Sequence, residues 1–68
     1  MKVRYLGGIR TWGEYIWGNE YEVKVYDPRC TVNLSFKIAD EYGREWWEDN
    51  RDFVISDPDL TYTEILEE

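Results

Sequence analysis

Few side chains in this chain of 68 residues are suited to acid–base or nucleophilic chemistry. The chain contains no histidine, and its single cysteine, Cys30, lies in a predicted turn with no base beside it. Without histidine, neither a serine–histidine nor a cysteine–histidine pair can form. Glu48, Asp49 and Asp52 are close carboxylates of the kind used in glycoside hydrolysis or for hard metal ions. Their spacing matches no calcium loop, so we expect no catalytic residue, no cofactor and no metal site.

The aromatic side chains offer a different chemistry, because twelve of the 68 residues are Phe, Trp or Tyr. Each buries roughly 150–250 Å² when enclosed, and the core of so short a chain cannot enclose all of them. Part of this surplus falls in one glycine-rich segment, together with an arginine: Arg10, Trp12, Tyr15 and Trp17. Trp, Tyr and Arg are enriched at the centres of protein interfaces, so these residues are candidate anchors for a partner or a planar ligand. The structural alternative is that one or two of the rings cap the core.

Trp46 and Trp47 are a second candidate pair in a predicted strand. Adjacent residues of a strand point to opposite faces of the sheet. One tryptophan must therefore contribute to the core, and the other must face outward. The outward indole is then exposed, covered by the tail, or part of an interface.

The charge of the chain is divided unevenly along the sequence. The net charge is −7, with +2 in residues 1–39 and −9 in residues 40–68. An acidic half repels phosphate backbones, so we expect no direct binding of nucleic acid. The expected acidic surface comprises Glu45, Glu48, Asp49 and Asp52. Such a surface steers a basic partner toward the protein. The alternative is that these acids only keep the protein soluble.

Alternation of apolar and polar residues predicts an all-β domain in residues 1–56. The predicted strands are 3–6, 20–26, 31–38, 45–48 and 53–55. Turn residues at 27–30 and at 40–43 predict two hairpins, with Gly43 supplying a positive φ. Residues 7–19 contain Gly7, Gly8 and Gly13, with Gly18 near the end, and predict a long loop. Five short strands in this order are typical of a small SH3-like barrel.

The last segment, residues 57–68, has five acids and no base and is predicted to be an acidic tail. Thr61 and Glu64 fit a capping box, which favours a short helical turn. A frayed tail is the alternative, because an isolated helix this short is marginal in water.

Several motifs of the chain resemble those of small SH3-like proteins of phages and prophages. They are Tyr5-x-Gly7, Gly18-x-Glu20-Tyr21-Glu22-Val23, Phe36-x-Ile38-x-Asp40-Glu41-x-Gly43-x-Glu45 and Phe53-x-Ile55. The chain differs by placing Asn19 where a lysine is usual, by the Trp46-Trp47 pair and by the acidic tail. A tryptophan pair also lines the peptide groove of eukaryotic-type SH3 domains, but the other motifs of that groove are absent from this chain.

The resemblance implies a mobile-element context rather than a mechanism. We expect a non-enzymatic phage protein that inhibits a bacterial host protein, such as a defence protein with a basic surface. The alternative is a homo-oligomeric sponge that traps a nucleotide-like signalling molecule with Arg4, Arg10 and Arg29. A structural phage component is a third reading. The sequence has neither a predicted membrane span nor a secretion signal, so we expect the protein in the cytoplasm of the infected host.

Overall fold

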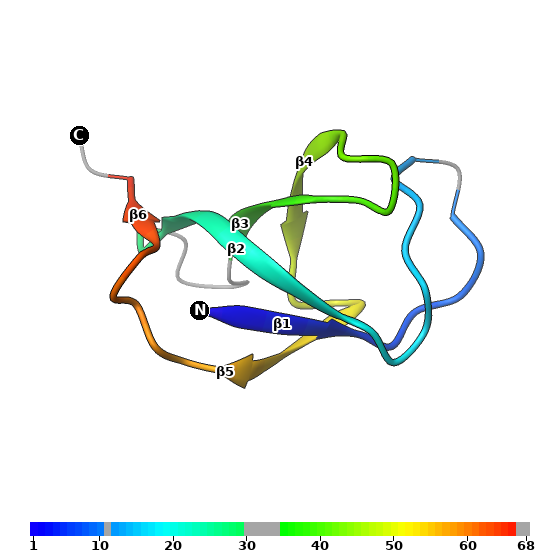
Figure 1. Cartoon of the computed structure of the whole chain (residues 1–68), viewed down its shortest axis with the longest axis horizontal. Helices are drawn as coiled ribbons and strands as arrows, with labels where there is room; N and C mark the ends of the chain where they lie inside the picture. The colour runs from blue at the N-terminus through cyan, green and yellow to red at the C-terminus, as the bar shows by residue number, and fades with distance from the viewer. Residues whose placement is uncertain (11, 30–34, 67–68) are drawn as a thin grey trace.

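The computed structural model describes residues 1–10, 12–29 and 35–66, which form six β-strands and no helix (Figure 1). The strands are β1 (Lys2–Tyr5), β2 (Glu20–Asp27), β3 (Ser35–Ala39), β4 (Glu45–Asp49), β5 (Phe53–Asp57) and β6 (Glu64–Ile65). The all-β prediction is confirmed, and each expected strand lies close to its predicted position. Residues 31–34 of the expected third strand, and Cys30, lie outside the described residues.

The five longer strands form an antiparallel sheet in the order β4–β3–β2–β1–β5. Strands β2, β3 and β4 follow one another as a meander, and β5 returns to pair with β1. Within the described residues, no ladder joins β4 to β5, so the sheet remains open along these two edges. The expected closure into an SH3-like barrel is therefore not confirmed.

Strand β2 connects the two parts of the sheet. Its first residues pair with β1, where Tyr21 lies opposite Val3, and its last residues pair with β3, where Tyr26 lies opposite Phe36. The register shifts between Val23 and Val25, as at a β-bulge, which bends a strand and increases its twist. One long strand thereby serves both parts of the sheet.

The core is built from Met1 and from alternate residues of four strands, and half of its members are aromatic. Its buried members are Met1, Val3, Tyr5, Tyr21, Val23, Phe36, Ile38 and Phe53. The Phe53 ring lies near the middle, with its centroid 5.1 Å from that of Tyr5 and 5.6 Å from that of Phe36. The tilted and edge-on contacts of these rings are the arrangements that aromatic pairs prefer.

The two tryptophans of β4 lie on opposite faces, as their adjacency requires. Trp46 is half-buried opposite the core residue Ile38, whereas Trp47 is 49% exposed opposite Lys37. The geometry thus assigns Trp47 as the outward residue. Residues i and i+2 of a strand share a face, so Glu48 lies on the same inner face as Trp46 and pairs with the core residue Phe36.

The predicted turn between β3 and β4 is confirmed. Gly43 has a φ of 82°, a conformation that residues with a Cβ rarely adopt. The backbone N–H of Asp40 donates to the carbonyl of Arg44 over 2.8 Å, and Gly43 donates to the carbonyl of Asp40 over 2.9 Å. This turn places the Asp40 side chain at the end of the sheet.

The predicted helical turn near Thr61 is wrong. Instead, β6 pairs in parallel with the end of β2, with Glu64 opposite Val25. The Thr63 hydroxyl is buried, donates to the carbonyl of Val23 over 3.2 Å and accepts from the N-terminal ammonium of Met1 over 2.9 Å. The free edge at the end of β2 offers backbone hydrogen bonds that one isolated helical turn lacks. As far as residue 66, the tail is therefore tied to the sheet and is not frayed.

Candidate functional site

The long loop, residues 6–19, packs against the turn between β3 and β4, residues 40–44. Both lie at the end of the molecule opposite β6 (Figure 1), and we call this region the loop end. The backbone N–H of Glu41 donates to the carbonyl of Glu14 over 2.9 Å. A second contact runs the other way, from the N–H of Glu14 to Oδ2 of Asp40 over 3.2 Å. The loop is thus joined to the sheet at its middle as well as at its ends.

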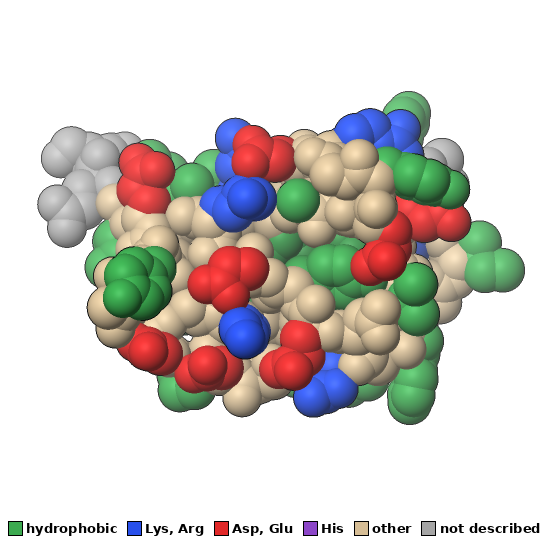
Figure 2. Space-filling model, viewed as in Figure 1, with side chains coloured by type: hydrophobic (Ala, Val, Ile, Leu, Met, Phe, Trp, Pro, Cys, Tyr) green, Lys and Arg blue, Asp and Glu red, His purple; other side chains and the backbone are tan. Residues whose placement is uncertain are grey.

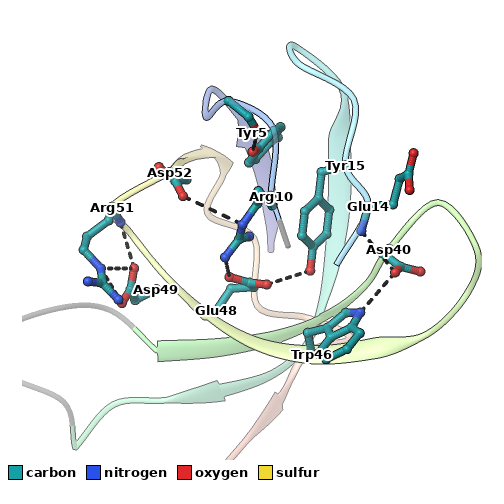
Figure 3. A network of polar contacts seen from close by, with 11 residues as sticks. Tyr5, Arg10, Glu14, Tyr15, Asp40, Trp46, Glu48, Asp49, Arg51 and Asp52 are labelled. Atoms are coloured by element: carbon teal, nitrogen blue, oxygen red, sulfur yellow. Dashed lines mark hydrogen bonds and ion pairs between the residues drawn. The ribbon is translucent and has the colours of Figure 1, made fainter. Parts of the chain in front are cut away.

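Asp40 is the main anchor of the loop end, and its side chain is fully enclosed (Figure 3). Besides Glu14, its carboxylate accepts hydrogen bonds from the backbone N–H groups of Tyr42 and Arg44 over 3.0 and 2.9 Å. The indole N–H of Trp46 donates to Oδ2 over 3.0 Å. Burial alone would raise the pKa of Asp40, but these donors outweigh it and lower the pKa to about 2. Asp40 therefore stays ionised and holds the loop, the turn and β4 together.

A second anchor lies under the loop, where Arg10 meets Glu48 (Figure 3). The Nη2 atom of Arg10 is 2.8 Å from Oε1 of Glu48, whose side chain is only 8% exposed. The Tyr15 hydroxyl donates to the other carboxylate oxygen over 2.9 Å. Burial, which alone would lower the pKa of Arg10, is outweighed by Glu48, and the pKa rises. Burial, reinforced by the Glu48 carboxylate, raises the pKa of Tyr15.

The Tyr15 side chain belongs to the packing of the core. Its ring makes contacts, at centroid distances of 5.1 to 5.3 Å, with Tyr5, Tyr21 and Phe53. The hydroxyl of Tyr21 accepts from the backbone N–H of Ile16 over 2.8 Å and donates to Glu41 over 2.6 Å. These contacts fix the second half of the loop against the sheet and the turn.

The apolar side chains of the same loop point outward. Trp12 and Trp17 are each 68% exposed, Ile16 is half exposed, and Ile9 is fully exposed. Figure 2 shows hydrophobic side chains gathered at the loop end, with acidic side chains between them. Single exposed apolar residues are ordinary on protein surfaces, whereas large contiguous apolar patches are typical of interaction sites.

One side of the loop end carries a continuous row of rings and one cation. The Trp12 and Trp46 centroids are 6.2 Å apart, and the guanidinium of Arg44 lies 5.9 Å from the Trp46 ring. The same guanidinium lies 5.4 Å from the ring of Tyr42, which is 69% exposed. Cation–π contacts of this kind orient exposed rings. Trp12 and Tyr42 expose most of this row to solvent, whereas Trp46 is half-buried between them and the core.

The sequence candidates in the loop divide into two groups. Trp12 and Trp17 are exposed, as expected of partner contacts, whereas Arg10 and Tyr15 point inward and hold the loop. Trp47 is exposed on the outer face of β4 and has no ring contact with the loop among the described residues. Trp47 thus lies on a different surface from Trp12 and Trp17, which belong to the loop, whereas Trp46 contacts Trp12.

The expected acidic surface needs one correction, because Glu48 is buried under the loop. The other three carboxylates are more exposed and have cations nearby. Glu45 lies 3.5 Å from Lys37, Asp49 lies 2.9 Å from Arg51, and Asp52 lies 3.9 Å from Arg10. Adjacent cations screen such carboxylates and weaken the field they present to a partner.

The arginines expected to bind a nucleotide-like ligand all have partners within the chain. Arg4 donates to the carbonyl of Gly18 and lies 3.7 Å from Glu20. Arg29 forms an ion pair of 2.9 Å with Asp27, and Arg10 is engaged by Glu48. A phosphate at any of these positions would lie beside a carboxylate that already pairs with the arginine.

Sequence reasoning recognised the turn at Asp40 but missed its role as an anchor. An aspartate at the start of a turn bonds nearby backbone N–H groups, and this signal was present in Asp40-Glu41-Tyr42-Gly43. The role of Tyr21 carried no signal, because its hydroxyl acts beyond the strand to which its ring belongs. Ile9 and Ile16 were also missed, because attention to aromatic residues passed over exposed aliphatic ones.

In the ranges that the structure describes, no group of three or more His, Cys, Asp or Glu side chains is arranged to hold a metal ion. The same ranges contain no helix with the length and apolar character needed to cross a membrane. Comparisons of the chain with protein-family models, curated proteins and solved structures find no match.

Proposed function

We propose that this protein is a non-enzymatic binding module that contacts a partner protein through the exposed apolar side chains of its long loop. The observation that carries the proposal is the exposure of Trp12 and Trp17, each 68%, on a loop that is otherwise firmly anchored. Tryptophan is among the residues that contribute most to binding when an interface buries it.

The anchoring of the loop supports this proposal energetically. Asp40 and the Arg10–Glu48 pair hold the loop backbone while leaving both indoles in solvent. Ordering a loop on binding costs free energy, so a loop already held in place retains more of its contact energy as affinity. An anchored loop with exposed aromatic residues is a better binding surface than a mobile loop of the same composition.

We also propose that the fold is an SH3-like barrel. The proposal is supported by the strand order β5–β1–β2–β3–β4, by the long loop after β1 and by the sequence motifs that resemble phage proteins. On that resemblance we place the protein in the cytoplasm of a phage-infected bacterium, as an inhibitor of a host defence protein.

A protein partner is favoured over the nucleotide sponge by the pairing of the arginines. Arg4, Arg10 and Arg29 each have a carboxylate within 4 Å, so each guanidinium already pairs with an acidic group where the sponge would need it to bind a phosphate. The net charge of −7 favours a partner with a basic surface.

Affinity capture from a bacterial lysate with four forms of the protein tests this proposal. Wild type and Trp47→Ala should retain the same proteins, whereas Trp12→Ala and Trp17→Ala should lose them. Trp47→Ala is the matched control, because it removes an exposed indole outside the loop. Equal capture by all four forms would refute the loop as the binding surface. With a purified partner, the association rate should also fall as ionic strength rises.

A further inference from the structure

An open hollow with a volume of about 290 Å³ lies between Ile9 and Trp17 on the loop. Tyr5, Gly7, Gly8 and Tyr15 complete its lining, which is therefore aromatic and backbone rather than charged. An apolar cavity of about 150 Å³ is large enough to bind benzene. The hollow thus has room for one branched or aromatic side chain.

The walls of this hollow are held by the last residue of β1. The Tyr5 hydroxyl donates to the carbonyl of Gly8 on one side. On the other side, the Tyr5 N–H donates to Asn19 over 3.0 Å, and its carbonyl accepts from Gly18 over 2.7 Å. The backbone next to Ile9 and Trp17 is therefore held in place without a ligand, which reduces the entropy lost on binding.

The loop end, on which the hollow opens, carries an excess of negative charge. Each arginine near the loop end is matched by one carboxylate: Arg4 by Glu20, Arg10 by Glu48 and Arg44 by Asp40. Three further carboxylates remain after this matching, on Glu14, Glu41 and Asp52. Among the described residues, the only cation within 4 Å of any of them is Arg10, at 3.9 Å from Asp52. Acidic side chains are visible between the apolar ones at this end (Figure 2).

We propose that this hollow receives a leucine- or phenylalanine-sized side chain from a segment of the partner protein that is flanked by arginine or lysine. The apolar lining selects the inserted side chain, and the excess carboxylates select its neighbours. A second copy of this chain fits less well, because each copy carries a net charge of −7. This inference rests on the proposed function and specifies the chemistry of the partner.

Blocked seven-residue peptides serve as probes of this site. Three of them place Gly-X-Gly between two pairs of arginines, with leucine, phenylalanine or glycine at X, and a fourth places the leucine centre between pairs of glutamates. NMR titration follows the backbone amide of Gly8 and the indole N–H of Trp17. The leucine and phenylalanine peptides should shift both signals and bind about tenfold or more tightly than the glycine peptide. The glutamate-flanked peptide should bind more weakly than its arginine-flanked counterpart.

Gly8→Leu tests the hollow itself. Gly8 lines the hollow, and a Cβ there would meet no atom within 4 Å, so a larger side chain is accommodated at this edge of the hollow without displacing the core. Its thermal midpoint should match that of wild type, while its affinity for the leucine peptide should fall about tenfold or more. Trp47→Ala should bind the peptides as wild type does.

The inference is overturned if no peptide binds, if glycine at X binds as well as leucine, or if Gly8→Leu retains full affinity. Self-association in sedimentation that shifts the same two signals would also overturn it, because a second copy would then be the occupant. The proposed function fails separately. If Gly8→Leu still captures the lysate proteins that Trp12→Ala and Trp17→Ala lose, the loop remains the binding surface and only the hollow is excluded.

Discussion

Replacement of Asp40 tests the account of how the loop is held. Asp40→Asn keeps the shape of the side chain but removes its charge and one of its acceptor oxygens. Asp40→Ala removes every acceptor and leaves the N–H groups of Glu14, Tyr42, Arg44 and Trp46 without their partner. We therefore expect the alanine variant to be much less stable than the asparagine variant.

The magnitude follows from the pKa of Asp40. That pKa is lowered from 3.8 to about 2 in the folded protein, a difference that corresponds to about 2 kcal/mol at neutral pH. The turn lies close to solvent, and screening reduces the contribution to between about 1 and 2 kcal/mol. A domain of this length has a total stability on the order of 3–10 kcal/mol. Asp40→Asn should therefore fold with a lower midpoint, whereas Asp40→Ala should be near the limit of folding.

The sign of the pH dependence is also fixed. A lowered folded-state pKa means that the stabilisation is complete above the unfolded value of 3.8 and is lost as the pH falls through about 2. In urea unfolding followed by tryptophan fluorescence, the free energies of unfolding of wild type and Asp40→Asn should differ most above pH 5. They should converge as the pH falls toward 2. Glu22→Gln, at an exposed position on β2, controls for the loss of one charge. A difference in the free energy of unfolding between wild type and Asp40→Asn that does not change with pH, or the absence of any difference at pH 7, would refute the reasoning.

Three further changes test other parts of the structure. Glu48→Ala leaves the Arg10 guanidinium without its nearest carboxylate and should lower the free energy of unfolding by about 2–4 kcal/mol in urea titrations; a change below about 0.5 kcal/mol would contradict a structural ion pair. The pKa of Tyr21 is raised from 10.0 to about 12 by burial and by its acidic hydrogen-bond partner, so its contribution is full below pH 10 and is lost as the pH rises through about 12. Tyr21→Phe should flatten this alkaline fall in thermal midpoint, and an unchanged fall would assign it to other groups. Gly43→Ala should lower the free energy of unfolding in urea titrations by about 1 kcal/mol, because the φ of Gly43 is 82°. Gly8→Ala should leave the free energy of unfolding nearly unchanged. Equal losses in the two variants would contradict the turn geometry.

The strands were predictable because burial on one face imposes a period of two. Val23 and Ile38 sit in clean alternating runs, and both are in the core. The same rule predicted opposed faces for Trp46 and Trp47. Applied one step further, it would also have placed Glu48 on the face of Trp46, since residues i and i+2 share a face. The burial of Glu48 was therefore within reach of the sequence, but its acidity suggested a surface position.

The loop was predictable in extent but not in orientation. A segment without periodic pattern does not indicate which side chains point inward, so Arg10 and Tyr15 were grouped with Trp12 and Trp17. Their inward position depends on Glu48, which is more than thirty residues away in the sequence. The prediction of a helical turn in the tail is wrong for a similar reason. Thr61 and Glu64 fit a local capping pattern, but the hydrogen bonds that determine the structure of the tail come from β2.

The anchors of the loop and its exposed residues are different sets of side chains. The anchors are a buried aspartate, an arginine–glutamate pair and two tyrosine hydroxyls, whereas Ile9, Trp12, Ile16 and Trp17 present their side chains to solvent. Under selection for a new or altered partner, the four exposed positions are therefore open to change at little cost in stability. A library that varies only these four positions would sample new binding specificities on a constant framework. Stability and recognition can therefore evolve through different residues of one short chain.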